Sequence, residues 1–265
     1  MERMKLYEQL VNMNGIAGHE RQVRNFVRAE LEKVSDEIIQ DRLGSVFGVS
    51  KGDGPVIMIA GHMDEVGAMV SKITPEGFIR MIPIGGLDPK VMYSQNVNIV
   101  INDEKTITGV IGAIPPHLTR GTTEPSLTFD DLLLDIGASS QAEAESMGVK
   151  LGQQVVPVNN YYVMENGNRI VSKAWDNRFG VGMAIEIMRE IHGKNHPNTV
   201  IAGATVQEEV GLRGATTASQ MVKPDLFIAV DVSPVGDFLS KDNILAFGKL
   251  GEGFLIRFYD PRCIM

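Results

Sequence analysis

The chain has 265 residues, of which 43% are hydrophobic and 22% are charged, so it can bury the core of one large domain or two modest ones. Its formal net charge is −8, and without a basic run it is unsuited to nucleic acid as its main partner. The single cysteine, Cys263, excludes an internal disulfide framework and a thiolate-rich metal site, so any metal must use nitrogen and oxygen ligands.

Segments that enter or cross a membrane are not evident in the sequence. No window approaches the roughly 18 uninterrupted apolar residues of a membrane span. The first ten residues carry charges where a secretory signal would be apolar. The expected compartment is therefore the cytoplasm.

The first elements predicted along the chain are a helix and a buried strand. Residues 20–34 place Val23, Val27, Leu31 and Val34 at helical spacing, which predicts an amphipathic helix. Residues 55–61 form a short apolar run between glycine-containing turns, typical of a strand covered on both faces of a parallel sheet. This strand runs directly into His62.

Between residues 68 and 162 the sequence changes to short strand-like pieces broken by Gly, Pro and Asn. Examples are residues 78–82 and 96–101. Residues 124–147 predict an additional acidic helical piece. Because ordinary connections contain about 2–6 residues, the whole stretch predicts an inserted, mostly β domain.

The alternation of strands and helices resumes after the insert. Residues 176–191 predict a long helix, and residues 199–206 and 226–230 predict buried strands on either side of a helix at 214–221. This order indicates an α/β sheet. A last strand-like segment covers residues 254–258.

Candidate functional side chains follow the predicted buried strands. His62 ends the first strand, where open α/β sheets place their ligand sites. Asp64 lies on the same side of the extended chain, so it is expected to orient the imidazole by accepting its second N–H. The alternative is an ordinary histidine beside a solvated turn. Asp231 ends the third strand at an equivalent height.

Three further carboxylates precede or follow predicted elements. Asp176 lies at the start of the long helix, where it either bridges two cations or caps the helix. Glu208 and Glu209 follow the second strand, and an unpaired buried carboxylate costs several kcal/mol, which a divalent cation offsets. Since successive side chains diverge, the two glutamates are expected to have different roles.

A shared site explains residues so far apart in the sequence, because a sheet gathers the ends of its strands. Imidazole and carboxylate ligands suit zinc, cobalt or manganese, and a bridging carboxylate implies two ions. Such ions lower the pKa of water from about 15.7 to about 7, so hydrolysis is the expected reaction.

Four motifs in order resemble the metallopeptidase family of glutamyl and leucyl aminopeptidases, some members of which are mislabelled endoglucanases. Shorter similarities occur near the N-terminus and in the insert, so the resemblance covers essentially the whole chain. The four motifs are Gly61-His-Met-Asp-Glu-Val-Gly67, Ala174-Trp-Asp-Asn-Arg-Phe-Gly180, Gln207-Glu-Glu-Val-Gly-Leu-Arg-Gly214 and Val230-Asp-Val-Ser-Pro234. The two shorter similarities are Gly15-Ile-Ala-Gly-His-Glu20 and Pro115-Pro-His117.

The resemblance implies a role for each candidate residue. His62 and Asp231 would bind one divalent ion, Glu209 the other, and Asp176 would bridge them. Asp64 would orient His62. Glu208 would be the general base for attack of a metal-activated water on the first peptide bond of a short peptide. The implied cofactors are two divalent ions, zinc or cobalt, with manganese as a third option.

The resemblance also implies an architecture and an assembly. The fold would be α/β, a phosphorylase/hydrolase-like mixed sheet flanked by helices, with an inserted mostly β, PDZ-like dimerisation domain. The catalytic domain would comprise residues 1–67 and 163–265, and the insert residues 68–162. Dimers would assemble into a tetrahedral dodecamer that admits short peptides, without nucleic acid or membrane partners.

One departure from the family concerns a further histidine ligand near the end of a longer chain. The sequence stops at Met265, and His19, His117, His192 and His196 are not obvious substitutes. If 265 residues is the native length, we expect one tight metal site and weak activity. The acidic or aliphatic preference for the first residue of the substrate is left open.

Two competing functions remain to be tested. A truncated, catalytically impaired homologue would act as an assembly or interaction protein. A glycosidase would use Glu208 and Glu209 as its two carboxylates, but adjacent residues are badly placed around a sugar. The low aromatic content of 6% also disfavours a sugar-binding cleft.

Overall fold

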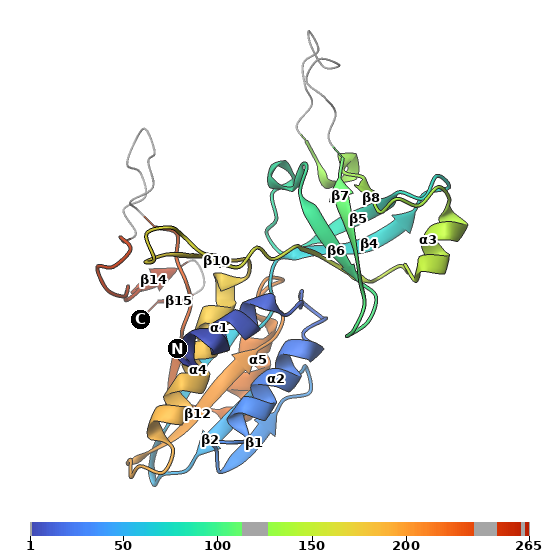
Figure 1. Cartoon of the computed structure of the whole chain (residues 1–265). Coiled ribbons are helices and arrows are strands. Elements are labelled where there is room, and N and C mark those ends of the chain that lie inside the picture. The colour runs from blue at the N-terminus through green and yellow to red at the C-terminus, as the bar shows by residue number, and fades with distance from the viewer. Residues whose placement is uncertain (1, 113–126, 236–247, 261–262, 265) are drawn as a thin grey trace. The chain divides into compact units, whose positions relative to one another are not determined.

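The computed structural model describes residues 2–112, 127–235, 248–260 and 263–264, coloured along the chain in Figure 1. The chain divides into two compact units, Met1–Asp231 and Val232–Met265. The predicted segment 115–117 lies outside the described residues. All the candidate site residues belong to the first unit.

A five-stranded mixed sheet forms the base of the first unit, with strand order β1-β2-β12-β3-β13. β2 pairs antiparallel with β1 and β12, whereas β12 and β13 pair parallel with β3 on its two sides. The three strands predicted to be buried are therefore parallel neighbours, but β13, at the end of the strand order, is mostly exposed, so its predicted burial is wrong. The strands are β1 (Glu37–Gln40), β2 (Val46–Ser50), β3 (Gly54–His62), β12 (Asn198–Thr205) and β13 (Leu226–Ala229).

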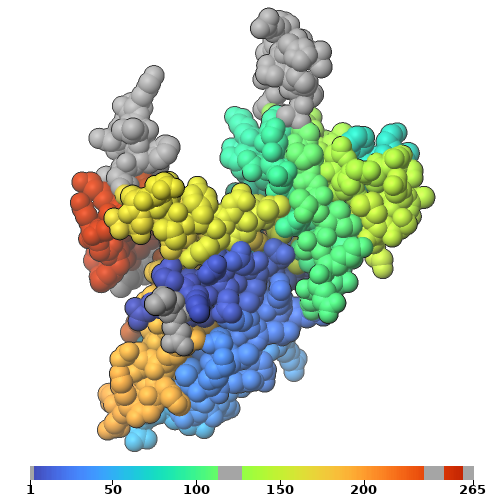
Figure 2. Space-filling model, in the orientation of Figure 1, coloured from blue at the N-terminus to red at the C-terminus, as the bar shows by residue number. Residues whose placement is uncertain are grey.

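Helices cover both faces of this sheet. On one face, α1 (Glu2–Asn12), α2 (Arg21–Leu31) and α4 (Trp175–Ile191) pack around Ile59 of β3. On the other face, α5 (Arg213–Val222) packs near Met58 and Ala60. Because alternate residues of β3 enter two different cores, its sequence is continuously apolar. The predicted mixed sheet flanked by helices is confirmed. Figure 2 shows α1 and α2 in blue beside α4 in orange.

The two predicted long helices are present with shifted starts. α2 buries Val23, Val27 and Leu31 completely, while Val34 lies beyond its end and is only partly buried. α4 ends at Ile191 as predicted, but Asp176 and Asn177 near its start have non-helical backbone angles. The regular helix therefore begins after Asn177, so Asp176 precedes it.

The insert forms a closed six-stranded barrel with its own core, in the order β4-β5-β8-β7-β6-β9. The mostly β character predicted for this stretch is confirmed. The barrel strands are β4 (Gly67–Ile73), β5 (Ile79–Ile84), β6 (Asn96–Val100), β7 (Thr106–Ile111), β8 (Leu134–Asp135) and β9 (Gln154–Pro157). The 3-10 turns η1 (Pro89–Met92) and η3 (Phe129–Asp131) and the helix α3 (Gln141–Met147) connect them.

The helical prediction for residues 124–147 is mostly wrong. Within the described part of that segment, helical turns occur only in η3 and α3, and β8 lies between them. The reason is the burial of Leu132, Leu134 and Ile136, which alternate with more exposed neighbours and fill the barrel. This period of two is typical of a strand.

Two short hairpins complete the described structure. β10 (Tyr162–Val163) pairs with β11 (Ile170–Val171) in the first unit, and β14 (Tyr259–Asp260) with β15 (Cys263–Ile264) in the second. The strand predicted at 254–258 is wrong, since its apolar side chains are exposed and strands need a packed face. Of the described helices, not one has the length and apolarity to cross a membrane.

Candidate metal centre

The parallel strand register brings three chain segments to one edge of the sheet. Thr205 of β12 lies opposite His62, the last residue of β3. Ala229 of β13 lies opposite Ala60, so Asp231, two residues further on, reaches the level of His62. Glu208 and Glu209 begin the loop after β12. The carboxyl ends of β3, β12 and β13 thus supply four of the candidate residues.

The start of α4 lies against β3 because two glycines leave room for it. A Cβ at Gly61 would lie 2.4 Å from the carbonyl carbon of Gly180, and a Cβ at Gly180 would lie 2.2 Å from the Val230 oxygen. Asn177 accepts the Gly180 N–H at 2.9 Å and donates to the Val230 oxygen at 2.8 Å. Asn177 therefore caps the regular helix, and Asp176 is left to face the site.

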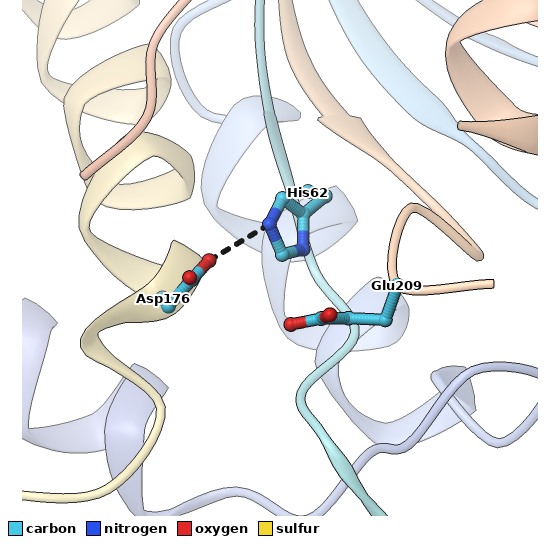
Figure 3. Close-up of side chains that lie close together, drawn as sticks. All are labelled: His62, Asp176 and Glu209. Atoms are coloured by element: carbon cyan, nitrogen blue, oxygen red, sulfur yellow. Dashed lines mark ion pairs between the residues drawn. The ribbon is translucent and has the colours of Figure 1, made fainter. Parts of the chain in front are cut away.

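The candidate side chains converge on the imidazole of His62. Its Nε2 lies 3.0 Å from Asp176, 3.7 Å from Glu208 and 4.0 Å from Asp231. One ligand atom from each of His62, Asp176 and Glu209 lies within 4.8 Å of the other two. Figure 3 shows Asp176 and Glu209 approaching His62 from opposite sides. His62 is 3% exposed, whereas Asp176 and Asp231 are open to solvent.

Asp64 contacts both His62 and the loop after β12. The backbone carbonyl of Asp64 lies 3.0 Å from His62 Nδ1, while the nearer carboxylate oxygen lies 3.6 Å away. That carboxylate accepts the backbone N–H groups of Glu208 and Glu209 at 3.0 Å each. The fully buried Asp64 therefore fixes the imidazole with its backbone and the glutamate pair with its side chain.

The clustering of carboxylates strongly perturbs the acid–base groups. Burial opposes protonation of His62, but hydrogen bonds to Asp176 and Asp64 and the charge of Asp231 outweigh it and raise its pKa to about 10. Burial raises the pKa of Glu209 to about 7, and the charges of Asp176 and Glu208 add to this shift against the opposing effect of His62. Burial likewise raises the pKa of Glu208.

A divalent cation fits this set of groups. Asp176 and Glu208 form their ion pairs with the single imidazole of His62 within the described part of the chain. The carboxylates of Asp176, Asp64 and Asp231 raise the pKa of His62, so a cation at the site would be stabilised by the same negative charges. Imidazole nitrogen and carboxylate oxygen are ligands suited to zinc, cobalt and manganese.

Several buried residues behind the cluster were not singled out from the sequence, although they lie in its motifs. Lys173 Nζ lies 2.8 and 2.9 Å from the two carboxylate oxygens of Glu65. The fully buried Arg178 donates to the Met63 oxygen at 2.7 Å and to the Leu10 oxygen at 2.7 Å. These contacts join the loops that carry His62 and Asp176. No distinct signal in the sequence marked these residues, because the motifs contain several other polar and charged residues.

The barrel also reaches the cluster. A Cβ at Gly85, just after β5, would lie 3.1 Å from Glu209 Cβ and 3.4 Å from Glu209 Oε2. Elsewhere, His196 contacts the Ser50 hydroxyl and the Asn198 carbonyl, at 2.8 Å in each case. The described structure thus gives His196 a local role, and His117 lies outside the described residues.

The mixed α/β sheet and the acidic cluster at the ends of its parallel strands are typical of a metal-dependent hydrolase. Residues 44–265 match the family model described as M42 glutamyl aminopeptidase. The chain therefore belongs to the M42 family of metal-dependent peptidases and is a peptidase hydrolase.

Similar proteins carry aminopeptidase names. The glutamyl aminopeptidase of Lactococcus lactis subsp. cremoris is 40% identical, over all of this chain and 75% of that protein. The TET aminopeptidase of a marine sediment thaumarchaeote is 38% identical with a TM-score of 0.89, over 96% of this chain and 72% of that one. The TET1 peptidase of Pyrococcus horikoshii is 31% identical with a TM-score of 0.77, over 90% of this chain and 72% of that one. That peptidase can assemble into a tetrahedron or a large octahedral shell.

Proposed function

We propose that the chain is a two-metal aminopeptidase that removes the N-terminal residue of short peptides. The observation that carries the proposal is the convergence of His62, Asp176 and Glu209, with Asp231 and Glu208 beside the same imidazole. His62 and Asp231 would hold one divalent ion and Glu209 the other, with Asp176 between them. Zinc or cobalt, or else manganese, suits this donor set.

The bound cations would supply Lewis-acid charge that lowers the pKa of water and polarises the peptide carbonyl. Glu208 would act as general base, taking the proton of the attacking water and passing it to the leaving amine. Burial raises the pKa of Glu208, which favours its acceptance of a proton. Asp64 would fix the positions of the His62 ring and of the Glu208–Glu209 backbone relative to each other.

Substitution of Glu208 by Gln tests the proposal. Because Gln cannot accept the proton, we expect hydrolysis to fall by about 10²–10⁴-fold while the bound metal content is unchanged. The assay measures release of the first residue from short peptides with Glu or Leu at the N-terminus. Matched peptides with an acetylated N-terminus should resist cleavage.

The matched control is Glu190→Gln, the same chemical change at an exposed residue near the end of α4. It should leave both activity and metal content unchanged. Peptidase activity that survives complete removal of metal, or an unaltered Glu208→Gln variant, would contradict the proposal. Activity on a cellulose analogue that survives chelation would instead favour the glycosidase.

We also propose that residues 68–162 carry a PDZ-like dimerisation domain between two catalytic parts, 1–67 and 163–265. The barrel in this region has exposed apolar residues on its outside, including Val91 and Leu151. The assembly of the Pyrococcus horikoshii TET1 peptidase supports a homo-oligomer, and our specific proposal is that dimers of this chain assemble into a dodecamer.

A further inference from the structure

Two buried carboxylates hold the backbone of the loop that carries the glutamate pair. Asp64 accepts the N–H groups of Glu208 and Glu209 at 3.0 Å each. Glu20, from the N-terminal segment, accepts the N–H group of Gln207 at 3.1 Å through Oε1. Three successive N–H groups of the loop are therefore satisfied by side chains rather than by a neighbouring strand.

The loop needs this support at Gln207 in particular. The β12 ladder ends at Thr205, and Gln207 has a φ of +54°, which is unfavourable for a residue with a side chain. Such a conformation is strained and persists only when its surroundings enforce it. An acceptor for the Gln207 N–H fixes the peptide unit between Val206 and Gln207, and so restrains the residue that immediately precedes Glu208.

Glu20 is built for this contact rather than for capping its own helix. It directly precedes α2, yet its side chain does not cap that helix, and the residue is only 6% exposed. The same Oε1 atom accepts the Gly18 N–H at 2.9 Å, which orients the carboxylate. Burial raises the pKa of Glu20, while backbone N–H groups of Gly18 and Gln207 oppose the rise.

We propose that Glu20 is a positioning residue for Glu208 and Glu209. It fixes the left-handed Gln207 so that one glutamate faces the substrate water and the other faces a metal ion. This gives a role to the N-terminal motif Gly15–Glu20, which is distant from the cluster in the sequence. The inference rests on the proposed function for the roles of the two glutamates, but the tether itself does not.

The test compares Glu20→Ala and Glu20→Asp, which withdraw the acceptor, with Glu20→Gln, which keeps an oxygen at Oε1. Hydrogen exchange of the metal-free full chain reports the tether directly. In the Ala and Asp variants, exchange at the Gln207 amide should accelerate by about tenfold or more, since this group loses its acceptor. Exchange at the amides of Glu208 and Glu209 should accelerate less, because Asp64 still accepts them. In the Gln variant, exchange should match the wild type.

The variants that accelerate exchange should also impair catalysis and zinc binding. We expect Ala and Asp to lower kcat by about 10–100-fold with little change in KM, and to weaken zinc affinity by about tenfold, while Gln restores both. The control is Ser140→Ala, which removes a side-chain acceptor from the Glu143 N–H at the start of α3, away from the site. Its exchange at 207–209, kcat and zinc affinity should be unchanged.

Unaltered exchange at Gln207–Glu209 in both Glu20→Ala and Glu20→Asp would overturn the inference. So would a Gln variant that behaves like Ala, because a mere loss of charge would then explain the effect. If the wild-type chain hydrolyses no peptide, the proposed function fails, and the exchange measurement still decides whether Glu20 holds the loop.

Discussion

At the scale of single residues, the sequence indicated which side chains matter better than how each one acts. Asp64 was predicted to accept the second N–H of His62 with its carboxylate. In the structure the Asp64 carbonyl is the nearer atom, at 3.0 Å, and the carboxylate holds the loop of Glu208 and Glu209. A two-residue spacing restricts where Asp64 lies, but backbone torsions decide which of its oxygens faces the ring.

The raised pKa values predict a pH dependence for the metal-free protein. Folding raises the pKa of Glu209 from 4.5 to about 7, so its stabilising contribution is lost as the pH rises towards 7. Folding raises the pKa of His62 from 6.5 to about 10, so that contribution is fully present below 6.5 and is lost as the pH rises through 10. The contribution of these two groups to the free energy of unfolding should therefore fall as the pH rises from 4.5 to about 10.

Urea unfolding with excess chelator at pH 5–9 measures this dependence. In the Glu209→Gln variant, the free energy of unfolding should change less with pH below pH 7, because Gln does not titrate. Saturating zinc should reduce the dependence further, since the ion takes the place of the protons. A metal-free wild type and a Glu209→Gln variant with identical pH profiles would contradict the prediction.

At the scale of elements, the predictions succeeded where one burial pattern covered a whole segment. β3 and β12 are buried over the halves that lead to the site, as their apolar runs predicted. β13 is a strand as predicted, but it ends the strand order and its residues are mostly exposed, so its predicted burial is wrong. The predictions also failed at 124–147, where acidic residues suggested a helix but Leu132 and Leu134 are needed inside the barrel. Tertiary burial therefore outweighed local composition in that segment.

The buried pair of Glu65 and Lys173 joins the segment after β3 to the segment before α4. Removing one partner of a buried ion pair costs about 3–5 kcal/mol. We expect Glu65→Gln to be worse than Lys173→Met, because Gln leaves both Lys173 and Arg178 buried, whereas Met leaves Glu65 with Arg178 at 3.6 Å. Urea unfolding of the two single variants and the double variant measures the coupling.

The double variant should cost less than the sum of the single variants, since the two charges are removed together. The exposed pair Arg28–Glu32 on α2 is the control. Arg28→Ala should change stability by at most about 0.5 kcal/mol. Additive effects of Glu65→Gln and Lys173→Met would show that the pair does not join the two segments energetically.

At the scale of the whole molecule, the barrel is the part whose role depends most on assembly. If residues 68–162 form the dimer contact and the dimers assemble into a dodecamer, the full chain should have a mass of about twelve times 28.9 kDa in light scattering. Val91→Asp, on the outside of the barrel at 58% exposure, should reduce this mass. Met221→Asp is the control, because it also replaces an exposed apolar side chain but lies on α5. It should leave the mass unchanged. A monomer of the wild-type chain would contradict the proposal.

The sequence by itself determined the α/β class, the three parallel strands and the strand-end residues His62, Glu208, Glu209 and Asp231, because a strand and the polar residues that follow it are close together along the chain. Only the tertiary structure decided that Asn177 rather than Asp176 caps α4, that the insert closes into a barrel and that Glu20 reaches Gln207. These features join residues that are distant in sequence or depend on backbone angles. Local periodicity carries no information about either.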